Sequence, residues 1–409
     1  MSPVLGCIAD DHTGGSDVAA ALRRAGMRTV LRFGVPGERA GVPDCDAVVV
    51  ALKTRSIPAD DAVTRTLAAQ RWLAALGVTR FYFKYCSTFD STDAGNIGPV
   101  ADALLGVLGG RTLICPASPE HGRTTYLGHL FVGDVLLSDS PMRHHPLTPM
   151  TDANLVRVLG RQTPHPVGLL PLTAVRRGPA FVQEHLDGLD VRHVVADATE
   201  EADLLALARA TSDWPLLTGG AGLAGAIARV AVPEAARTAE IVPLPPGPGV
   251  ILAGSCSAAT LGQLDQALAR FPGHRLDPVA APVPAELAAV AVEWLERNLG
   301  DGPVVLYSSA PAEQRATGPG IAEVLEETLG LLARRAVELG VRRIAVAGGE
   351  TSGAVTTALG VEQVVVGDEA DRGVPWCVTT TDDPVALLLK SGNFGRPDLL
   401  VRAMDGATR

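Results

Sequence analysis

Residues 4–25 read VLGCIADDHTGGSDVAAALRRA and set a pattern that the rest of the chain repeats. The apolar run Val4–Ala9 predicts a buried β-strand, and Asp17–Ala25, closed by Gly26, predicts an amphipathic helix. We expect the polar stretch between them, DDHTGGS, to be a loop. A strand, a loop and a helix in this order are typical of parallel sheets with crossover helices.

The same alternation continues through the first third of the chain. Further strands are predicted over Thr29–Gly34, Ala47–Leu52, Phe81–Tyr85 and Arg111–Cys115, and helices over Asp60–Leu76 and Asn96–Leu108. The strands are apolar throughout rather than alternating, which indicates that helices cover both faces of the sheet. The stretch 116–171 is irregular, and such a segment is usually functional or an excursion from the domain.

A proline-rich stretch, PLPPGPG at 243–249, divides the chain. This composition excludes a helix or a central strand and favours a stiff, extended linker. The α/β pattern then starts again with strand Val250–Ala253. We therefore expect an α/β protein of two domains, residues 1–242 and 250–409, each a mainly parallel sheet flanked by helices, with a ligand cleft between them.

The second domain repeats the rhythm of the first. Strands are predicted over Val250–Ala253, Val304–Ser308, Arg343–Ala347 and Gln363–Val366. Helices are predicted over Ala258–Ala269, Ala285–Leu299, Gly318–Leu339 and Ala354–Leu359.

Composition disfavours several classes of protein. The formal net charge of −10 disfavours nucleic acid as a partner, because phosphate neutralisation needs a basic surface. No window approaches the ~18 uninterrupted apolar residues of a membrane span. The six cysteines form no C-x-x-C pair, which argues against zinc and against a disulfide framework. The start lacks a basic region and two Asp follow early, so we expect no signal peptide and a cytoplasmic protein.

Lysine is rare in this chain, and each lysine lies in a polar motif. Lys53, Lys84 and Lys390 are the only lysines, in KTRS, FKYCSTFDST and LLLKSGNFG. Either they survive by chance, or they place a compact charge against a phosphate or carboxylate, which a planar guanidinium cannot do.

Two polar clusters in the first half are candidates for binding a small polyhydroxylated acid. Ligands of parallel sheets bind beyond the carboxyl ends of strands, and Asp10 and Asp11 directly follow the first strand. They are the candidate catalytic residues, to deprotonate a hydroxyl or hold Mg²⁺. The alternative role, which we favour less, is to cap the helix that follows. The candidate acceptor-binding residues, in KTRS and the Ser/Thr-rich stretch 84–92 that follows the apolar run Phe81–Phe83, are Arg55, Lys84, Ser87, Thr88, Asp90, Ser91 and Thr92.

Two glycine- or serine-rich loops in the second half predict phosphate cradles. The loop Gly348-Gly349-Glu350-Thr351-Ser352-Gly353 lies between a strand and a helix, where backbone N–H groups approach anions closely. It does not match the Walker pattern. Glu350 suits either Mg²⁺ held through water or a capping role. The loop 254–257, GSCS, is a second cradle, and SGNFG at 391–395 is expected to close over the nucleotide.

A further glycine motif has two interpretations. Residues 220–225, GAGLAG, match the dinucleotide-binding pattern G-x-G-x-x-G. The match lies late in its half of the chain rather than after a first strand, so turn and packing glycines are the favoured interpretation.

Taken together, these loops resemble those of the four-carbon acid sugar kinase family. ADDHTGGSD, LKTRS, FKYCSTFDST with GNIGP, CPASPEHGRTT, GSCS, GGETSG and SGNFG occur in that order along the whole chain. The resemblance, closest to the 3-oxo-tetronate kinases, implies a sugar-binding N-terminal domain, a nucleotide-binding C-terminal domain and transfer of the ATP γ-phosphoryl group to the terminal hydroxyl. It also implies that ATP contacts Ser255 or Ser257, the loop Gly348–Gly353 and Gly392. It carries over neither a catalytic base nor the Mg²⁺ ligands.

Three alternatives remain at this point. The expected acceptor is 3-oxo-tetronate, and the nearest alternative is D-threonate or D-erythronate, which differs from the 3-oxo acid at one carbon. The glycine motif leaves open a nicotinamide-dependent dehydrogenase, and the same loops would also suit a non-catalytic sensor of acid sugars. As partners we expect the sugar acid and ATP, with no nucleic acid and no membrane; a homodimer is the commonest assembly.

Overall fold

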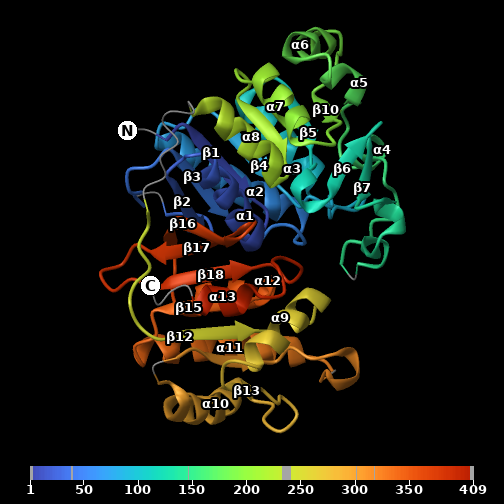
Figure 1. Cartoon of the computed structure of the whole chain (residues 1–409). Helices are drawn as coiled ribbons and strands as arrows, with labels where there is room; N and C mark the ends of the chain where they lie inside the picture. The colour runs from blue at the N-terminus through green and yellow to red at the C-terminus, as the bar shows by residue number, and fades with distance from the viewer. Residues whose placement is uncertain are drawn as a thin grey trace. The chain divides into compact units, whose positions relative to one another are not determined.

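The computed structural model describes residues 3–37, 40–145, 147–232, 241–300, 302–316 and 318–405. The chain forms two compact units, Met1–Glu240 and Ile241–Arg409. Each is an α/β unit with a large, mainly parallel sheet, as expected (Figure 1). The ligand cleft expected between the domains stays a prediction.

The first unit is built on a parallel sheet. Its strands, in the order β2-β3-β1-β4-β11-β5-β10-β9, are β1 (Leu5–Ala9), β2 (Thr29–Phe33), β3 (Ala47–Ala51), β4 (Phe81–Lys84), β5 (Thr112–Cys115), β9 (Val167–Leu170), β10 (His193–Ala196) and β11 (Leu216–Gly219). Its helices are α1 (His12–Arg24), α2 (Ala59–Ala75), α3 (Ile97–Leu108), α4 (Leu155–Gly160), α5 (Leu172–Val175), α6 (Pro179–Asp187), α7 (Glu201–Ala210) and α8 (Ala221–Ala231).

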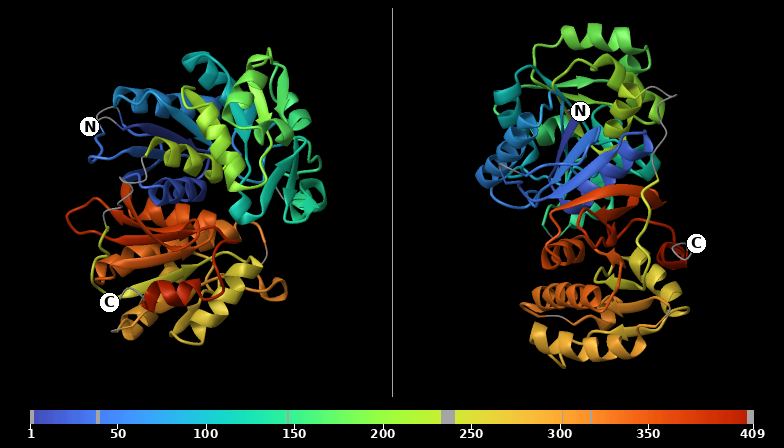
Figure 2. Two further views of the ribbon diagram at one scale, coloured as in Figure 1. Left: turned by 45° about the horizontal axis from the view of Figure 1, so that its top comes forward. Right: turned by 90° about the vertical axis from the view of Figure 1, so that its left-hand side faces the viewer.

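Burial on both faces explains the apolar strands of this sheet. All five residues of β1 and of β3 are buried, and helices lie on both sides of the sheet (Figure 2). Trp72 and Leu73 of α2 join the core that contains Val48 and Val50 of β3. Burial of such side chains contributes roughly 1.5–3 kcal/mol each.

The irregular segment carries a small antiparallel sheet of its own. β6 (Arg123–Tyr126), β7 (His129–Val132) and β8 (Val135–Leu136) form it. The buried carboxylate of Asp197 accepts hydrogen bonds from the backbone N–H groups of Leu127 (2.7 Å) and Gly128 (2.9 Å), which ties the sheet to the loop after β10. The segment is therefore a structured excursion.

The second unit is mixed rather than uniformly parallel. Its strands, in the order β13-β14-β12-β15-β18-β17-β16, are β12 (Gly249–Ala253), β13 (Gly273–Arg275), β14 (Val304–Tyr307), β15 (Arg343–Ala347), β16 (Gln363–Asp371), β17 (Val374–Thr379) and β18 (Ala386–Lys390). Its helices are α9 (Ala258–Leu268), α10 (Pro284–Asn298), α11 (Ile321–Glu338), α12 (Gly349–Ala358) and α13 (Leu399–Asp405). The pairs from β13 to β18 are parallel, whereas β17 pairs antiparallel with both β18 and β16.

The glycine motif at 220–225 serves close packing. A Cβ on Gly220 would lie 2.6 Å from the Pro116 carbonyl oxygen, and one on Gly222 would lie 2.8 Å from that of Ala117. Gly220 precedes α8, and Gly222 and Gly225 lie within it, in place of the turn expected there. The chain therefore needs the first two glycines where α8 approaches the loop after β5.

Gly220→Ala is expected to lower the free energy of unfolding by about 1–3 kcal/mol, because the added methyl group meets backbone that cannot move aside. Gly225→Ala is the matched control, since its Cβ would make only ordinary contact, 3.5 Å from the Ala21 Cβ. That change is expected to be neutral or slightly stabilising within a helix. Denaturant unfolding of both variants checks the difference, and equal stabilities would contradict the packing role.

Candidate active site

The candidate residues of the first unit converge because three neighbouring strands are parallel. β1 pairs in parallel with β3 on one side and β4 on the other. Their carboxyl ends therefore lie at one edge, where Asp10 follows β1, Arg55 follows β3 and Lys84 ends β4.

Arg55 is the centre of this cluster. Its guanidinium donates to both carboxylate oxygens of Asp10, from Nε at 2.9 Å and from Nη2 at 2.7 Å. Nη2 also donates to Asp11 Oδ1 at 2.7 Å, and Asp90 Oδ2 lies 3.9 Å from Nη1. The Asn96 side chain holds the loop that carries Arg55 by donating to the Thr54 carbonyl at 2.6 Å. Such bidentate geometry fixes both partners in position.

Asp11 caps helix α1, one of the two roles considered for it. Its Oδ1 accepts a hydrogen bond from the Gly14 N–H (2.9 Å) and its Oδ2 accepts one from the Thr13 hydroxyl (2.8 Å). The helix therefore begins at His12, five residues before the start predicted from the sequence. Burial would raise the pKa of Asp11, but Arg55, Lys84 and these hydrogen bonds together hold that pKa below its usual value.

Asp10 lies in a different environment from its neighbour. It is buried, and burial raises the pKa of its carboxyl group above the usual value, although the Arg55 charge opposes the shift. A carboxylate whose pKa is raised is the better proton acceptor at neutral pH.

Lys84 is a buried cation that lies beside Asp17, a carboxylate that was not among the residues predicted from the sequence. Its side chain is 3% exposed, and the ammonium donates to the Tyr85 carbonyl at 2.9 Å and lies 3.8 Å from Asp17 Oδ2. Burial raises the pKa of Asp17, and within the described residues its buried Oδ1 has no hydrogen-bond partner. One signal in the sequence could have revealed Asp17: it lies three residues after Gly14, and residues three apart share one face of a helix. In the structure that face meets Lys84, because a Cβ on Gly14 would lie 3.2 Å from Lys84 Nζ.

The Ser/Thr-rich loop divides into residues that hold its shape and one that remains open. Gln162 accepts from the Ser91 hydroxyl (3.2 Å) and donates to the Thr92 carbonyl (2.7 Å), so these two residues anchor the loop. Thr88 Oγ1 donates to Asp90 Oδ1 at 2.6 Å. Within the ranges described above, the Ser87 hydroxyl has no partner, which leaves it available to a ligand.

One residue of this loop adopts a rare backbone conformation. Phe89 has φ = 54° and is fully buried, in edge-to-face contact with Tyr85. A positive φ costs a bulky residue energy that the surrounding packing must offset, and such positions are common at functional sites.

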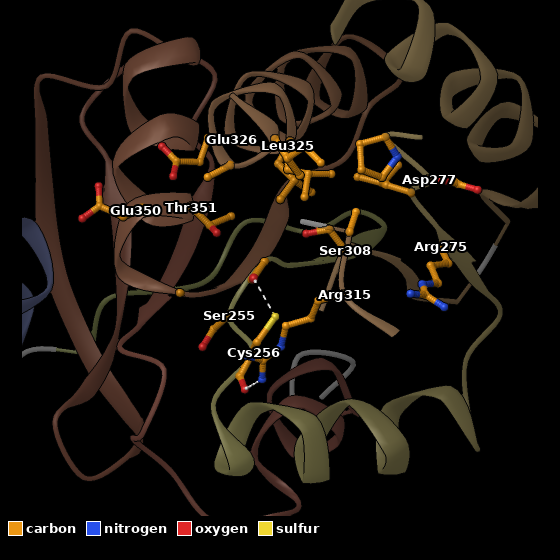
Figure 3. A pocket seen from close by; sticks show the side chains of 18 of the residues that line it. Ser255, Cys256, Arg275, Asp277, Ser308, Arg315, Leu325, Glu326, Glu350 and Thr351 are labelled. Carbon is orange, nitrogen blue, oxygen red and sulfur yellow. Dashed lines mark hydrogen bonds between the residues drawn. The ribbon is translucent and has the colours of Figure 1, made fainter. Parts of the chain in front are cut away.

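In the second unit, a pocket of about 1110 Å³ opens beyond the carboxyl ends of β12, β13, β14 and β15 (Figure 3). Five predicted nucleotide-binding residues line it: Ser255, Gly348, Gly349, Glu350 and Thr351. Ser257, Ser352, Gly353 and Gly392 do not line it. As in α1, helix α12 begins earlier than predicted, at Gly349, so the expected loop is mostly its first turns.

Gly348 is required for the wall of this pocket. Its φ of +136° lies in a region that other residues avoid, and a Cβ there would lie 3.2 Å from the Ser255 backbone nitrogen. Because glycine has no side chain, the loops after β12 and β15 can approach each other closely at this position.

Several predicted residues support the pocket from behind. Ser352 Oγ donates to the Gly348 carbonyl at 2.7 Å. Ser257 caps α9 and donates to the Gly392 carbonyl at 2.5 Å. A Cβ on Gly392 would lie 2.5 Å from Ser255 Oγ, which brings SGNFG beside GSCS.

The sequence reading missed the other half of the pocket. Leu276, Val279, Ile321 and Leu325 give it an apolar wall, and Arg275, Asp277, Ser308 and Arg315 add polar groups. The Arg315 guanidinium donates to the Cys256 carbonyl at 3.0 Å and so ties two lining loops together. Position gave a signal for Ser308, which directly follows the apolar strand β14, whereas β13 reads GHR and has no apolar run to mark its end.

The described residues contain no group of three or more His, Cys, Asp or Glu side chains that would hold a metal ion. None of their helices has the length and apolar character needed to cross a membrane.

Known proteins resemble both units. A model described as a sugar-binding N-terminal domain matches residues 5–227, and one described as a nucleotide-binding C-terminal domain matches residues 250–400. A 3-oxo-tetronate kinase of Burkholderia multivorans is 50% identical over 99% of this chain and 98% of its own. Its namesake in Haemophilus influenzae is 41% identical over 97% and 98%.

Two solved structures share the fold over nearly the full length. A Salmonella typhimurium protein, provisionally described as a tRNA synthase, superposes with a TM-score of 0.90 at 39% identity, covering 98% of this chain and 99% of that chain. A Haemophilus influenzae protein gives a TM-score of 0.82 at 39% identity with the same coverage.

His12 supplies a pH test of the buried cluster. Burial lowers the pKa of its imidazole to about 4, with Lys53 acting in the same direction and Asp11 against it. Between pH 4 and 6.5 the unfolded chain then binds more protons at His12 than the folded chain, so stability is gained as the pH rises. We expect His12→Gln to flatten this rise in the free energy of unfolding.

Exposed His144 offers the matched control. Denaturant unfolding at pH 4.5 and 6.5 should give His144→Gln the wild-type difference and His12→Gln a smaller one. A wild-type difference in His12→Gln would contradict the buried, neutral state of His12.

Proposed function

Because this chain belongs to the four-carbon acid sugar kinase family and is an ATP-dependent sugar-acid kinase, we propose that its acceptor is 3-oxo-tetronate, phosphorylated to 3-oxo-tetronate 4-phosphate. One observation carries the proposal: curated relatives named 3-oxo-tetronate kinase are 41–50% identical to it over nearly its whole length. We also infer a cytoplasmic location, and a homodimer stays a prediction.

We propose that ATP binds in the pocket of the second unit. Ser255 and the loop Gly348–Thr351 offer hydroxyl groups and backbone N–H groups at the start of α12, which suit phosphate. The wall formed by Ile321 and Leu325 suits the apolar faces of a nucleobase. Ser352 supports this loop by donating to the Gly348 carbonyl, and Ser257 holds the neighbouring turn by donating to the Gly392 carbonyl.

The residues of this pocket fit Mg²⁺ bound together with a nucleotide. Mg²⁺ is commonly held by one or two carboxylates plus substrate phosphates and water, so a dedicated cluster of acidic residues is not needed. Glu350 lines the pocket, is exposed and has no partner for its carboxylate within the described part of the chain. We infer that Glu350 holds the ion, which would neutralise charge on the transferred phosphoryl group.

We propose that the acceptor binds at the Arg55 cluster of the first unit. Lys84 and Arg55 would meet its carboxylate, and Ser87, Thr88 and Asp90 would meet its oxygen substituents. Ser91 and Thr92 act by anchoring the loop through Gln162.

The transfer requires little covalent chemistry from the protein. The terminal hydroxyl oxygen of the acceptor forms a bond to the γ-phosphorus, and the bond from that phosphorus to the bridging oxygen breaks, so ADP leaves. The hydroxyl proton passes to a carboxylate. Of the two candidates, we infer that Asp10 accepts the proton, because burial raises its pKa, while Asp11 is occupied in capping α1.

The alternatives are separated by their acceptor and their cofactor. The glycines at 220 and 222 are occupied by packing, so the dehydrogenase alternative loses the motif on which it rested. A non-catalytic sensor would not release ADP. D-threonate and D-erythronate remain the competing acceptors.

A coupled assay of ADP release across the three acids tests the proposed acceptor. We expect kcat/KM to be highest for 3-oxo-tetronate. Equal or higher values for D-threonate or D-erythronate would overturn the choice of acceptor, and release that does not depend on any of the acids would overturn the acceptor site.

Asp10→Asn is expected to lower kcat by roughly 10²-fold or more, since an amide cannot accept the proton. Asp11→Asn is the matched variant, because Asn also caps helices well and only the charge is lost. Steady-state kinetics, with circular dichroism to verify folding, should show the larger loss for Asp10→Asn. A larger loss of kcat for Asp11→Asn would reverse the assignment.

Leu325→Asn is expected to raise the KM for ATP about tenfold while changing the KM for the acid little, because it removes apolar contact from the nucleobase wall. Leu332, which is buried in the same helix and does not line the pocket, provides the control as Leu332→Met. An unchanged KM for ATP in a folded Leu325→Asn protein would place the nucleobase elsewhere.

A further inference from the structure

Lys390 is a buried cation that the proposed chemistry does not yet use. It ends β18 and is 1% exposed. Its ammonium donates to Thr260 Oγ1 at 2.7 Å and to the Gly392 carbonyl at 3.0 Å. In the described part of the chain, no carboxylate oxygen lies within 4.0 Å of Lys390 Nζ, the distance limit for an ion pair. A buried charge without a counter-charge destabilises a fold, so its retention calls for a reason.

The Gly392 carbonyl is unusually well held. It accepts hydrogen bonds from Ser257 Oγ (2.5 Å), Thr260 Oγ1 (2.9 Å) and Lys390 Nζ (3.0 Å). A carbonyl oxygen has two lone pairs, so three donors saturate it and fix its direction.

Fixing this carbonyl also fixes the N–H group of the same peptide unit. A trans peptide is planar, so the Asn393 N–H points opposite to the Gly392 carbonyl, away from the three donors. Within the ranges that the structure describes, neither the Gly392 N–H nor the Asn393 N–H has a hydrogen-bond partner. Two successive free N–H groups form a typical anion-binding concavity.

This turn lies against the pocket. Gly392 lies so close to Ser255 Oγ that a side chain on residue 392 would not fit, and Ser255 in turn lies close to Gly348. Ser255 and Gly348 both line the pocket. A cation and two N–H donors therefore lie beside Ser255, at the edge of the wall where we propose the phosphates.

We propose that Lys390 is a positioning residue for the nucleotide phosphates: with Thr260 it holds the Gly392 carbonyl inward, so that the Asn393 N–H of the same peptide unit faces outward, toward the polyphosphate. This inference rests on the proposed ATP site. The ammonium also supplies a positive charge that the phosphates would compensate, since no carboxylate among the described residues pairs with it. Burial lowers the pKa of Lys390 to about 8, in keeping with a cation that lacks an anionic partner until nucleotide binds.

Lys390→Met and Thr260→Val, with the double variant, test the proposal. Both are close to isosteric, and both remove a group that acts on the Gly392 carbonyl. We expect the Kd for ADP, measured by calorimetry, and the KM for ATP to rise about tenfold or more in Lys390→Met and several-fold in Thr260→Val. The KM for the acid and the kcat at saturating ATP should change little.

The double variant separates positioning from general damage to the fold. Because both side chains act through one carbonyl, the double variant should bind ADP about as weakly as Lys390→Met alone. Arg343→Met is the control: Arg343 is a buried cation at the opposite end of the neighbouring strand β15, and its loss should alter stability without altering the Kd for ADP.

An unchanged Kd for ADP in folded Lys390→Met, or strictly additive effects in the double variant, would overturn the proposal. If Lys390→Met does not fold, Thr260→Val decides, and an unchanged Kd there overturns it equally. Failure of the wild-type protein to bind ADP would instead refute the proposed ATP site.

Discussion

The parallel pairing of neighbouring strands is the constraint on which both candidate sites depend. In the first unit, the register of β1 with β3 and β4 places Asp10, Arg55 and Lys84 at one edge of the sheet. In the second unit, the register of β12 with β14 and β15 brings Ser255, Ser308 and Gly348 to a single pocket. A slip of one residue in either sheet would turn these side chains to the other face.

The cations at the two candidate sites are held in place by hydrogen bonds to neighbouring groups. The chain is acidic overall, with a formal charge of −10, so anionic ligands need cations at fixed places. Arg55 is locked by a bidentate contact with Asp10, Lys84 by the Tyr85 carbonyl and Asp17, and Lys390 by Thr260 and the Gly392 carbonyl. Because these groups are oriented before a ligand arrives, binding energy is not lost in ordering them.

The fold class and the loops that carry candidate residues could be predicted because both depend on local patterns. An apolar run followed by Asp or Gly indicates the end of a parallel strand, as it does after β1, β12 and β15. The early starts of α1 and α12 could not be read in this way. Glycines at 14, 15 and 349 disfavour helix, yet the Asp11 cap starts α1, and Gly15 lies where a Cβ would be 2.5 Å from that of Ala51. Strand β17 was not predicted because it contains Pro375, which disfavours a strand. Strand β18 was not predicted because its residues LLLK run directly into the polar motif SGNFG. Asp17 and the apolar wall of α11 depend on contacts between segments distant in sequence, which no local pattern reports.

The central claim is that the chain transfers the γ-phosphoryl group of ATP to the terminal hydroxyl of a four-carbon acid. Phosphorus-31 nuclear magnetic resonance of a reaction containing the protein, ATP, Mg²⁺ and 3-oxo-tetronate tests it most directly. The account predicts ADP together with a new phosphomonoester signal coupled to the two protons of the terminal methylene group. Inorganic phosphate as the only new product, or an ester on another carbon, would contradict it.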